Sequence, residues 1–265
     1  MLGKSQKITS KLTICTAIFI LPLGIMLFSI LSVSLDSIRK DRRELKGIEV
    51  LRPAISLMQV LPRHIWLSID RLTIDQATGS LENSRQEISA LLDMLGESYE
   101  AHFGREANVV STQALLENWR LMSRGGTQNN VLRAYAQFMA ELCRIIAYVG
   151  DISGLVTDSD LEGAYLVAAA VRDLPQTQER MVLIGNLLLA FGSGEYTDQQ
   201  IDELKRHLDL LVFSDIYRIQ NSIVAAETLR MRDTETSEEL ELHLRNCYND
   251  IAYFAITVEH IINAH

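Results

Sequence analysis

The chain is poor in residues that break helices and lacks the motifs of common active sites. Only four of its 265 residues are proline. No stretch alternates apolar and polar residues with the β-branched enrichment that indicates strands. The combinations H-E-x-x-H, E-x-x-H and C-x-x-C-H are absent, as is a glycine-rich phosphate loop. We therefore expect an all-α protein that is not an enzyme and that binds no metal or cofactor.

Cysteine is also scarce, with three residues in the whole chain. Cys15 falls in a long apolar run, so a disulfide within the chain would join Cys143 and Cys247. Their spacing fits no metal-binding motif. We favour two buried free thiols over a disulfide, because unpaired cysteine behaves as a small apolar side chain.

Acidic residues are missing from the first 35 positions, and all 34 of them follow. Because 22 of the 25 basic residues also lie there, the region from residue 36 to the end carries a net charge of −12. A domain with this charge repels phosphate backbones, so we expect it to bind no nucleic acid. Its length is enough to bury a substantial core.

Charged side chains are absent from Leu12 to Leu35, a run of 24 residues. A helix of this length spans the roughly 30 Å hydrocarbon layer of a membrane. A cleaved signal peptide is the alternative, since Ser32 and Ser34 resemble a cleavage site, but the apolar cores of such peptides run to about 15 residues. We predict a tail at 1–11, a transmembrane helix at 12–35 and a helical domain at 36–265.

Flanking charge does not fix the orientation of this predicted anchor. Three basic residues precede it and four follow it closely, with acidic residues between the latter. Long domains cross the membrane largely regardless of such charges. The seven basic residues are Lys4, Lys7, Lys11, Arg39, Lys40, Arg42 and Arg43.

Apolar residues after the anchor recur at steps of three and four, which is typical of helix faces in a bundle. One such series runs from Val131 to Val149 and another from Leu240 to Ile261. We expect the first helix to continue unbroken out of the membrane to about Ile74, in an elongated antiparallel bundle of the four-helix type or in two stacked modules. The predicted helices are 36–76, 81–102, 106–123, 130–150, 160–191, 197–229 and 236–265.

Helix ends are indicated by caps and glycines. Thr197 with Gln200, and Ser159 with Glu162, have the spacing of capping boxes, and Gly154 is suited to end the preceding helix. A hydrophobic staple between Tyr196 and Ile201 would flank the first box. Weaker breaks are expected at 77–80, near Gly104, and at 125–130, 192–194 and 232–236.

All four prolines, Pro22, Pro53, Pro62 and Pro175, fall inside helical patterns. Each removes one backbone hydrogen bond, so each predicts a kink or a wide turn. These residues either curve long helices around the core or, at Pro53 and Pro62, open the first helix where a ligand binds.

Two segments resemble the extracytoplasmic sensor regions of bacterial methyl-accepting chemotaxis proteins and related transmembrane receptors. The first is E-L-K-G-I-E-V-L-R-P at 44–53, continued by L-P-R-H at 61–64. The second is V-G-D-I-S-G-L-V-T-D-S-D-L-E-G-A-Y-L at 149–166. The resemblance spans about residues 40–190. It implies a periplasmic bundle, a cytoplasmic tail, a single-pass anchor in the inner membrane and a homodimer, and it identifies the chain as the input half of a receptor.

The resemblance and the proline positions together suggest where a ligand would bind. We expect Arg63, His64, Trp66 and Tyr165 to contact a small polar or anionic metabolite. Two of them also have a structural interpretation: His64 as a hydrogen-bonded core residue, and Trp66 as a core or interface anchor.

The leading functional prediction is the ligand-sensing input region of a transmembrane, chemoreceptor-like signal transducer. A membrane-tethered adaptor or structural protein that binds another protein is the alternative. A bundle that holds haem or metal through His64 and a second histidine is a third possibility. The first two differ in whether the bundle interior has a polar pocket.

Overall fold

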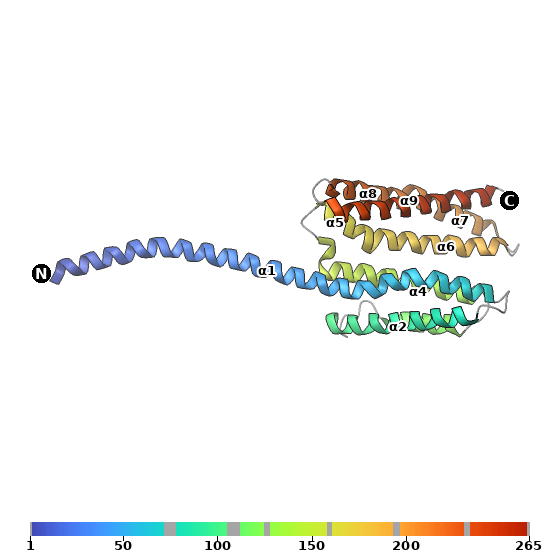
Figure 1. The fold of residues 1–265 in the computed structure, drawn as a ribbon, viewed down its shortest axis with the longest axis horizontal. Helices are drawn as coiled ribbons and strands as arrows, with labels where there is room; N and C mark the ends of the chain where they lie inside the picture. Colours follow the sequence, from blue (N-terminus) through green and yellow to red (C-terminus); the bar gives the residue numbers. More distant parts are fainter. Residues whose placement is uncertain are drawn as a thin grey trace. The chain divides into compact units, whose positions relative to one another are not determined.

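The computed structural model of the chain describes residues 2–71, 78–104, 112–124, 128–157, 161–192, 197–230 and 234–263. Within these ranges every regular element is helical, which confirms the predicted all-α class (Figure 1). The α-helices are α1 Leu2–Arg71, α2 Thr78–Phe103, α3 Thr112–Ser123, α4 Gln128–Ser153, α5 Leu161–Ala168, α6 Leu174–Gly192, α7 Asp198–Leu210, α8 Ile216–Arg230 and α9 Thr234–Asn263. A 3₁₀ turn, η1 Leu155–Thr157, and two π-turns, η2 Ala169–Asp173 and η3 Leu211–Asp215, complete the list.

The chain forms two compact units, Met1–Leu45 and Lys46–His265. The first unit is the N-terminal part of α1, and its apolar side chains Phe28 and Val33 are 74% and 68% exposed. Among the residues searched, no helix is long and apolar enough to cross a membrane. Within the anchor predicted at 12–35, the side chains of residues 12–25, 27 and 30 lie outside the described set. The transmembrane helix therefore stays a prediction.

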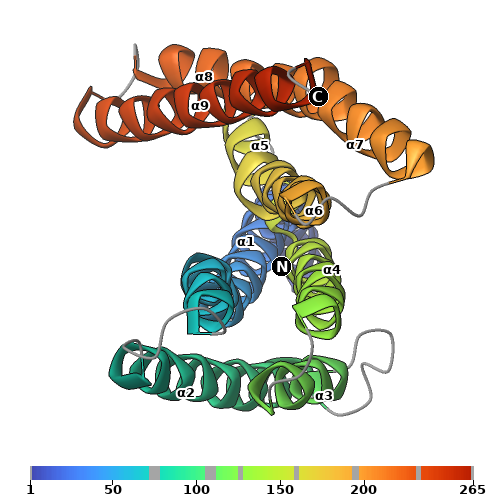
Figure 2. The same ribbon diagram turned by 90° about the vertical axis from the view of Figure 1, so that its right-hand side faces the viewer.

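The second unit contains two hydrophobic cores. The first is built by α1 to α4 around fully buried Leu61 and Phe138. The second is built by α6 to α9 around fully buried Ile184 and Leu204. In the end view of Figure 2, α2 and α3 lie on one side of α1 and α4, while α6 lies on the other with α7 to α9 beyond it. The unit is a helical bundle, as predicted, and it contains two hydrophobic cores.

Helix α6 belongs to both cores. Its side chains Val182 and Leu189 pack against the first core, whereas Met181 and Leu188 pack against the second. A helix with apolar side chains on opposite faces is expected to be covered on both sides. This position makes α6 the element through which the two halves of the bundle meet.

Helix α1 runs without a break through Pro53 and Pro62, as predicted, and its described part ends at Arg71. Pro62 has no N–H to donate to the carbonyl of Met58, four residues earlier. The side-chain amide of Gln178 on α6 donates to that carbonyl instead, at 2.5 Å. The proline therefore creates a docking point between α1 and α6.

The helix ends agree with the cap chemistry where it is described. The backbone N–H of Gln200 donates to the Thr197 hydroxyl at 3.3 Å, and the N–H of Thr197 donates to the Gln200 side chain at 2.9 Å. This confirms the predicted capping box. Gly104 and Gly154 follow the ends of α2 and α4 with φ of 72° and 80°, a conformation that favours glycine. Ser159 and Tyr196, predicted for the second box and the staple, lie outside the described residues.

The structure differs from the predicted helices 160–191 and 197–229 because each contains a π-turn. In η2, the N–H of Leu174 bonds to the carbonyl of Ala169, five residues back. Pro175 follows directly, and the wider turn moves the preceding carbonyls away from its ring. In η3, the N–H of Ile216 bonds in the same way to Leu211. No proline accompanies that turn, and nothing in the structure explains it.

Two glycines allow close helix contacts, and one of them brings together the two segments that carry the family resemblance. A Cβ on Gly47 of α1 would lie under 3.0 Å from Cβ of Ser153 on α4. A Cβ on Gly150 would lie equally close to Cγ1 of the buried Val171 in η2. The segments 44–53 and 149–166 thus meet at Gly47, whereas the Gly150 contact joins α4 to η2.

Replacing Gly47 with alanine is expected to lower the free energy of unfolding by about 2 kcal/mol, because the facing Ser153 Cβ cannot move without its backbone. The matched control is Gly96→Ala in α2, where an added Cβ meets nothing within 4 Å. That change is expected to raise the free energy of unfolding by up to about 1 kcal/mol. Chemical unfolding followed by circular dichroism measures both. Equal effects at the two positions would contradict the close packing of α1 and α4.

Candidate functional site

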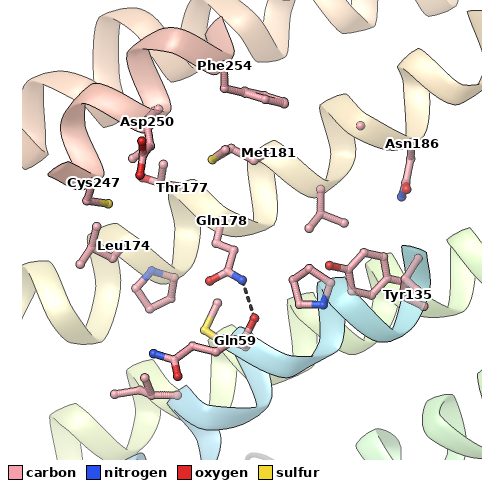
Figure 3. Close-up of a pocket in the computed structure, with 18 of the residues that line it drawn as sticks. Gln59, Tyr135, Leu174, Thr177, Gln178, Met181, Asn186, Cys247, Asp250 and Phe254 are labelled. Carbon is pink, nitrogen blue, oxygen red and sulfur yellow. Dashed lines mark hydrogen bonds between the residues drawn. The ribbon is translucent and has the colours of Figure 1, made fainter. Parts of the chain in front are cut away.

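A pocket of about 800 Å³ lies in the second unit between α1, α4, α6 and α9 (Figure 3). Its position is between the two hydrophobic cores, because its walls include Ile65 and Tyr135 of the first core and Ile251 of the second. The volume is in the range of small-molecule sites, and such sites favour clefts between helices. Most of the lining side chains are apolar. They include Ile55, Met58, Pro62, Leu132, Leu174, Pro175, Met181, Val182, Leu189 and Phe254.

A glycine on α6 contributes to the space. Gly185 lines the pocket, and a Cβ built on it would meet nothing within 4 Å. Glycine in the middle of a helix costs up to about 1 kcal/mol relative to alanine. A larger residue here would fill part of the pocket and stabilise the helix, so this position keeps the pocket open at a cost in stability.

Polar groups of α6 fix its distance from the first core. Gln178 donates to the Met58 carbonyl, and the Asn186 side chain donates to the Leu132 carbonyl on α4 at 3.5 Å. Thr177 donates to the Asp173 carbonyl within its own helix at 2.8 Å. These donors are engaged in holding the pocket walls.

Unlike these donors, Tyr135 of α4 is a lining residue whose buried polar atom is unpaired among the described residues. It is 4% exposed, and its hydroxyl has no hydrogen-bond partner in the part of the chain that the structure describes. Burial raises the pKa of this phenol, so it stays a neutral donor and acceptor. In Figure 3 the hydroxyl points into the space between the lining side chains. An unpaired buried hydroxyl costs about 1–3 kcal/mol, which a bound group with a hydrogen-bonding atom would offset.

The titratable side chains of the pocket come from α9. His243 and Asp250 are exposed, and Cys247 is half-buried. Burial, and secondarily the Asp250 carboxylate, raises the pKa of the Cys247 thiol. Both Cys143 and Cys247 are free thiols, as predicted, but only Cys143 is buried. Cys143 donates to the Pro175 carbonyl at 3.4 Å.

A buried charge cluster joins the two π-turns. Asp215, the last residue of η3, is fully buried and binds Arg180 of α6 at 2.6 Å and Arg218 of α8 at 2.5 Å. Arg218 also lies 3.6 Å from Asp173, the last residue of η2. Arg172 approaches the same carboxylate at 3.1 Å. The pocket wall around Ala170 and Leu174 is therefore tied by charge to α8.

The residues predicted to bind a ligand do not gather in this pocket. Arg63 is exposed on α1, and Tyr165 is 49% exposed on α5. The side chain of Trp66 lies outside the described residues. Arg63 and Tyr165 are not part of the pocket lining, whereas the neighbouring Pro62 and Ile65 belong to it.

His64 lies in the first core and is 1% exposed. Its Nδ1 shares a hydrogen bond of 2.6 Å with the hydroxyl of Ser84 on α2. Its ring meets the indole of Trp119 on α3 edge to face, with 5.0 Å between the ring centres. Burial, and secondarily the charge of Arg85, lowers the pKa of His64 to about 4. It is therefore neutral at physiological pH.

Sequence reasoning missed Tyr135 and Gly185 as site residues. Tyr135 falls in the apolar series from Val131 to Val149. Its signal in the sequence is the hydroxyl, a polar atom on that apolar face. Gly185 stands between apolar residues in a long helical pattern, where glycine has a cost that calls for an explanation.

Comparison of the chain with protein-family models, curated proteins and solved structures finds no match. Among the residues searched, no three His, Cys, Asp or Glu side chains are grouped so that they could hold one metal ion.

Proposed function

We propose that the chain is the ligand-sensing input region of a membrane-anchored, chemoreceptor-like signal transducer. The observation that carries the proposal is the pocket between the two cores, which is large enough for a small molecule and contains the unpaired hydroxyl of Tyr135, although its walls are mostly apolar and not polar as predicted. The resemblance at 44–53 and 149–166 supports the same function. A periplasmic domain, an inner-membrane anchor and a homodimer accompany it in this proposal.

The anchor is supported by the sequence and by the exposed apolar residues of the first unit. Met26, Phe28, Leu31, Val33 and Leu35 are all more than half exposed. Exposed apolar side chains in this number require cover, and hydrocarbon provides it. The 24-residue run without charge has the necessary length.

Sensing requires that the ligand bind one helix arrangement better than another. The pocket suits this requirement because its walls come from helices of both cores. A molecule that contacts α1 and α4 on one side and α9 on the other would favour one distance between them. Its differential affinity sets the upper limit of the shift.

The adaptor function has its own supporting observation. Phe213 of η3, Tyr217 of α8 and Tyr253 of α9 are 77%, 62% and 74% exposed. Aromatic side chains are enriched in protein interfaces. If the pocket binds nothing, these residues become the primary site for a protein partner.

The orientation is tested with reporter fusions after His265 in bacterial cells. Alkaline phosphatase, which folds outside the cytoplasm, is expected to be active, and a reporter that works only in the cytoplasm is expected to be inactive. The physical basis is translocation of the domain past an anchor at 12–35. Activity of the cytoplasmic reporter alone would contradict a periplasmic sensor.

Ligand binding is tested by a thermal-shift screen of the full chain in lipid nanodiscs. The compounds are amino acids, organic acids, nitrogen oxyanions and neutral aromatic and aliphatic molecules. Ligand at a hundred times its dissociation constant adds about 2.7 kcal/mol, which raises the midpoint by several degrees. A broad screen without a hit would remove the sensor proposal and favour the adaptor.

A further inference from the structure

We infer that the pocket between α1, α4, α6 and α9 takes a neutral, largely apolar molecule that carries one hydrogen-bonding group, and that this group pairs with the Tyr135 hydroxyl. The inference deepens the proposed sensor function and rests on it. It names a ligand class that differs from the polar or anionic metabolite predicted from the sequence.

The apolar walls of the pocket indicate that most of the ligand is apolar. Side chains from four helices, such as Met58, Leu132, Met181 and Phe254, face the pocket. Burial of apolar surface contributes about 25 cal/mol per Å², so a molecule with a hydrocarbon framework gains most here. The Met58 and Met181 side chains are flexible enough to adjust to its shape.

The hydrogen bonds of the lining residues indicate that the ligand carries one polar group. Gln178, Asn186 and Thr177 donate to backbone carbonyls of the protein. The other two amide side chains of the lining, Gln59 and Asn246, are exposed. Tyr135 is the lining residue with a buried polar atom that has no partner among the described residues. One unsatisfied hydroxyl calls for one complementary atom on the ligand.

The preference for a neutral molecule over an anion follows from the charges of the lining residues. Among the described residues that line the pocket, none is lysine or arginine. The lining histidine, His243, is exposed and lies 3.7 Å from the Glu239 carboxylate, and Asp250 adds a negative charge on the same helix. An anion would lose its hydration without gaining a cation, which is costly in an apolar site. The exposed Arg63 is not part of the lining.

Three probes with the same rings separate these requirements. 2-Naphthol is neutral and has one hydroxyl, naphthalene has no polar group, and 2-naphthoate is an anion. All three are small enough for a pocket of about 800 Å³. Their binding to the full chain in lipid nanodiscs is measured by equilibrium dialysis.

Two matched leucine variants separate pocket binding from partitioning into lipid. Gly185→Leu fills the pocket, whereas Gly96→Leu places the same side chain at another open helical glycine that is not part of the lining. Because both variants carry the same lipid, the difference in bound probe reports the pocket. Tyr135→Phe removes the hydroxyl and leaves the ring.

The expected result is that 2-naphthol binds the wild type and Gly96→Leu alike and binds Gly185→Leu at least tenfold more weakly. Tyr135→Phe is expected to weaken 2-naphthol about three- to tenfold and to leave naphthalene unchanged, as loss of one hydrogen bond predicts. In the wild type, 2-naphthoate is expected to bind more weakly than 2-naphthol.

Equal or tighter binding of 2-naphthoate, or binding that Gly185→Leu does not reduce, would overturn the inference. If the probes fail but polar compounds from the thermal-shift screen bind and are lost in Gly185→Leu, the ligand class is wrong and the sensor proposal stands. If neither the probes nor the screened compounds bind, both fail.

Discussion

Replacing Asp215 with asparagine is expected to lower the free energy of unfolding by about 3 kcal/mol. Asp215 is fully buried and is the shared partner of Arg180 and Arg218. Removing one member of a buried ion pair typically costs 3–5 kcal/mol, because the remaining charges stay desolvated without a partner. The arginine side chains are 20% and 30% exposed, which places the effect at the lower end. Urea unfolding followed by circular dichroism gives the value.

The matched control for Asp215 is an ion pair at the surface. Glu82 pairs with Arg85 at 3.2 Å, and its side chain is 53% exposed. Glu82→Gln is expected to change the free energy of unfolding by less than about 1 kcal/mol, since water screens such pairs. If Asp215→Asn is as mild as this control, the charge cluster does not hold η2 and η3 together.

Acidification from pH 7 to pH 4 is expected to destabilise the protein by about 3 kcal/mol through His64 alone. Burial lowers the pKa of His64 from 6.5 to about 4. Between these values the unfolded chain binds the proton and the folded chain does not, so the free energy of unfolding falls as the pH falls. The effect is absent above about pH 7 and approaches its maximum below about pH 4.

The His64 contribution is measured as the difference between the pH profiles of wild type and His64→Gln. This subtraction removes His207, whose pKa is also lowered by burial, and all other titrating groups. His243→Gln serves as the control, because the His243 side chain is 71% exposed. A His64→Gln profile parallel to that of the wild type would contradict a neutral, buried His64.

Much of the helical framework follows from local sequence. Three-and-four spacing of apolar residues predicted α4 and α9, and the Thr197–Gln200 box fixed the start of α7. These features depend on residues within one or two turns of each other. The π-turns at 169–173 and 211–215 were missed because one extra residue in a turn leaves the apolar pattern nearly unchanged.

The pocket could not be predicted because its walls come from four helices far apart in the chain. Pro62 lies in the part of α1 that lines the pocket. The Met58 carbonyl, which the proline leaves without its helical donor, accepts a hydrogen bond from Gln178 of α6 and is not left for a ligand. His64 is a polar residue beside an apolar helix face. Its hydrogen bond to Ser84 and its ring contact with Trp119 explain that position. Whether a polar residue finds a hydrogen-bond partner depends on tertiary packing. The spacing of residues in a single sequence does not reveal that packing.

The most direct test of sensing is the distance between α1 and α9 with and without ligand. Spin labels on ketone-bearing amino acids at Arg52 and Glu259, both exposed, leave the native cysteines in place. Double electron–electron resonance on the full chain in nanodiscs then reports the distance distribution with no ligand and with a saturating hit from the thermal-shift screen. A ligand-dependent shift in the populations, absent when the same compound is added to Gly185→Leu, is the predicted result. An unchanged distribution at saturation would contradict a sensor.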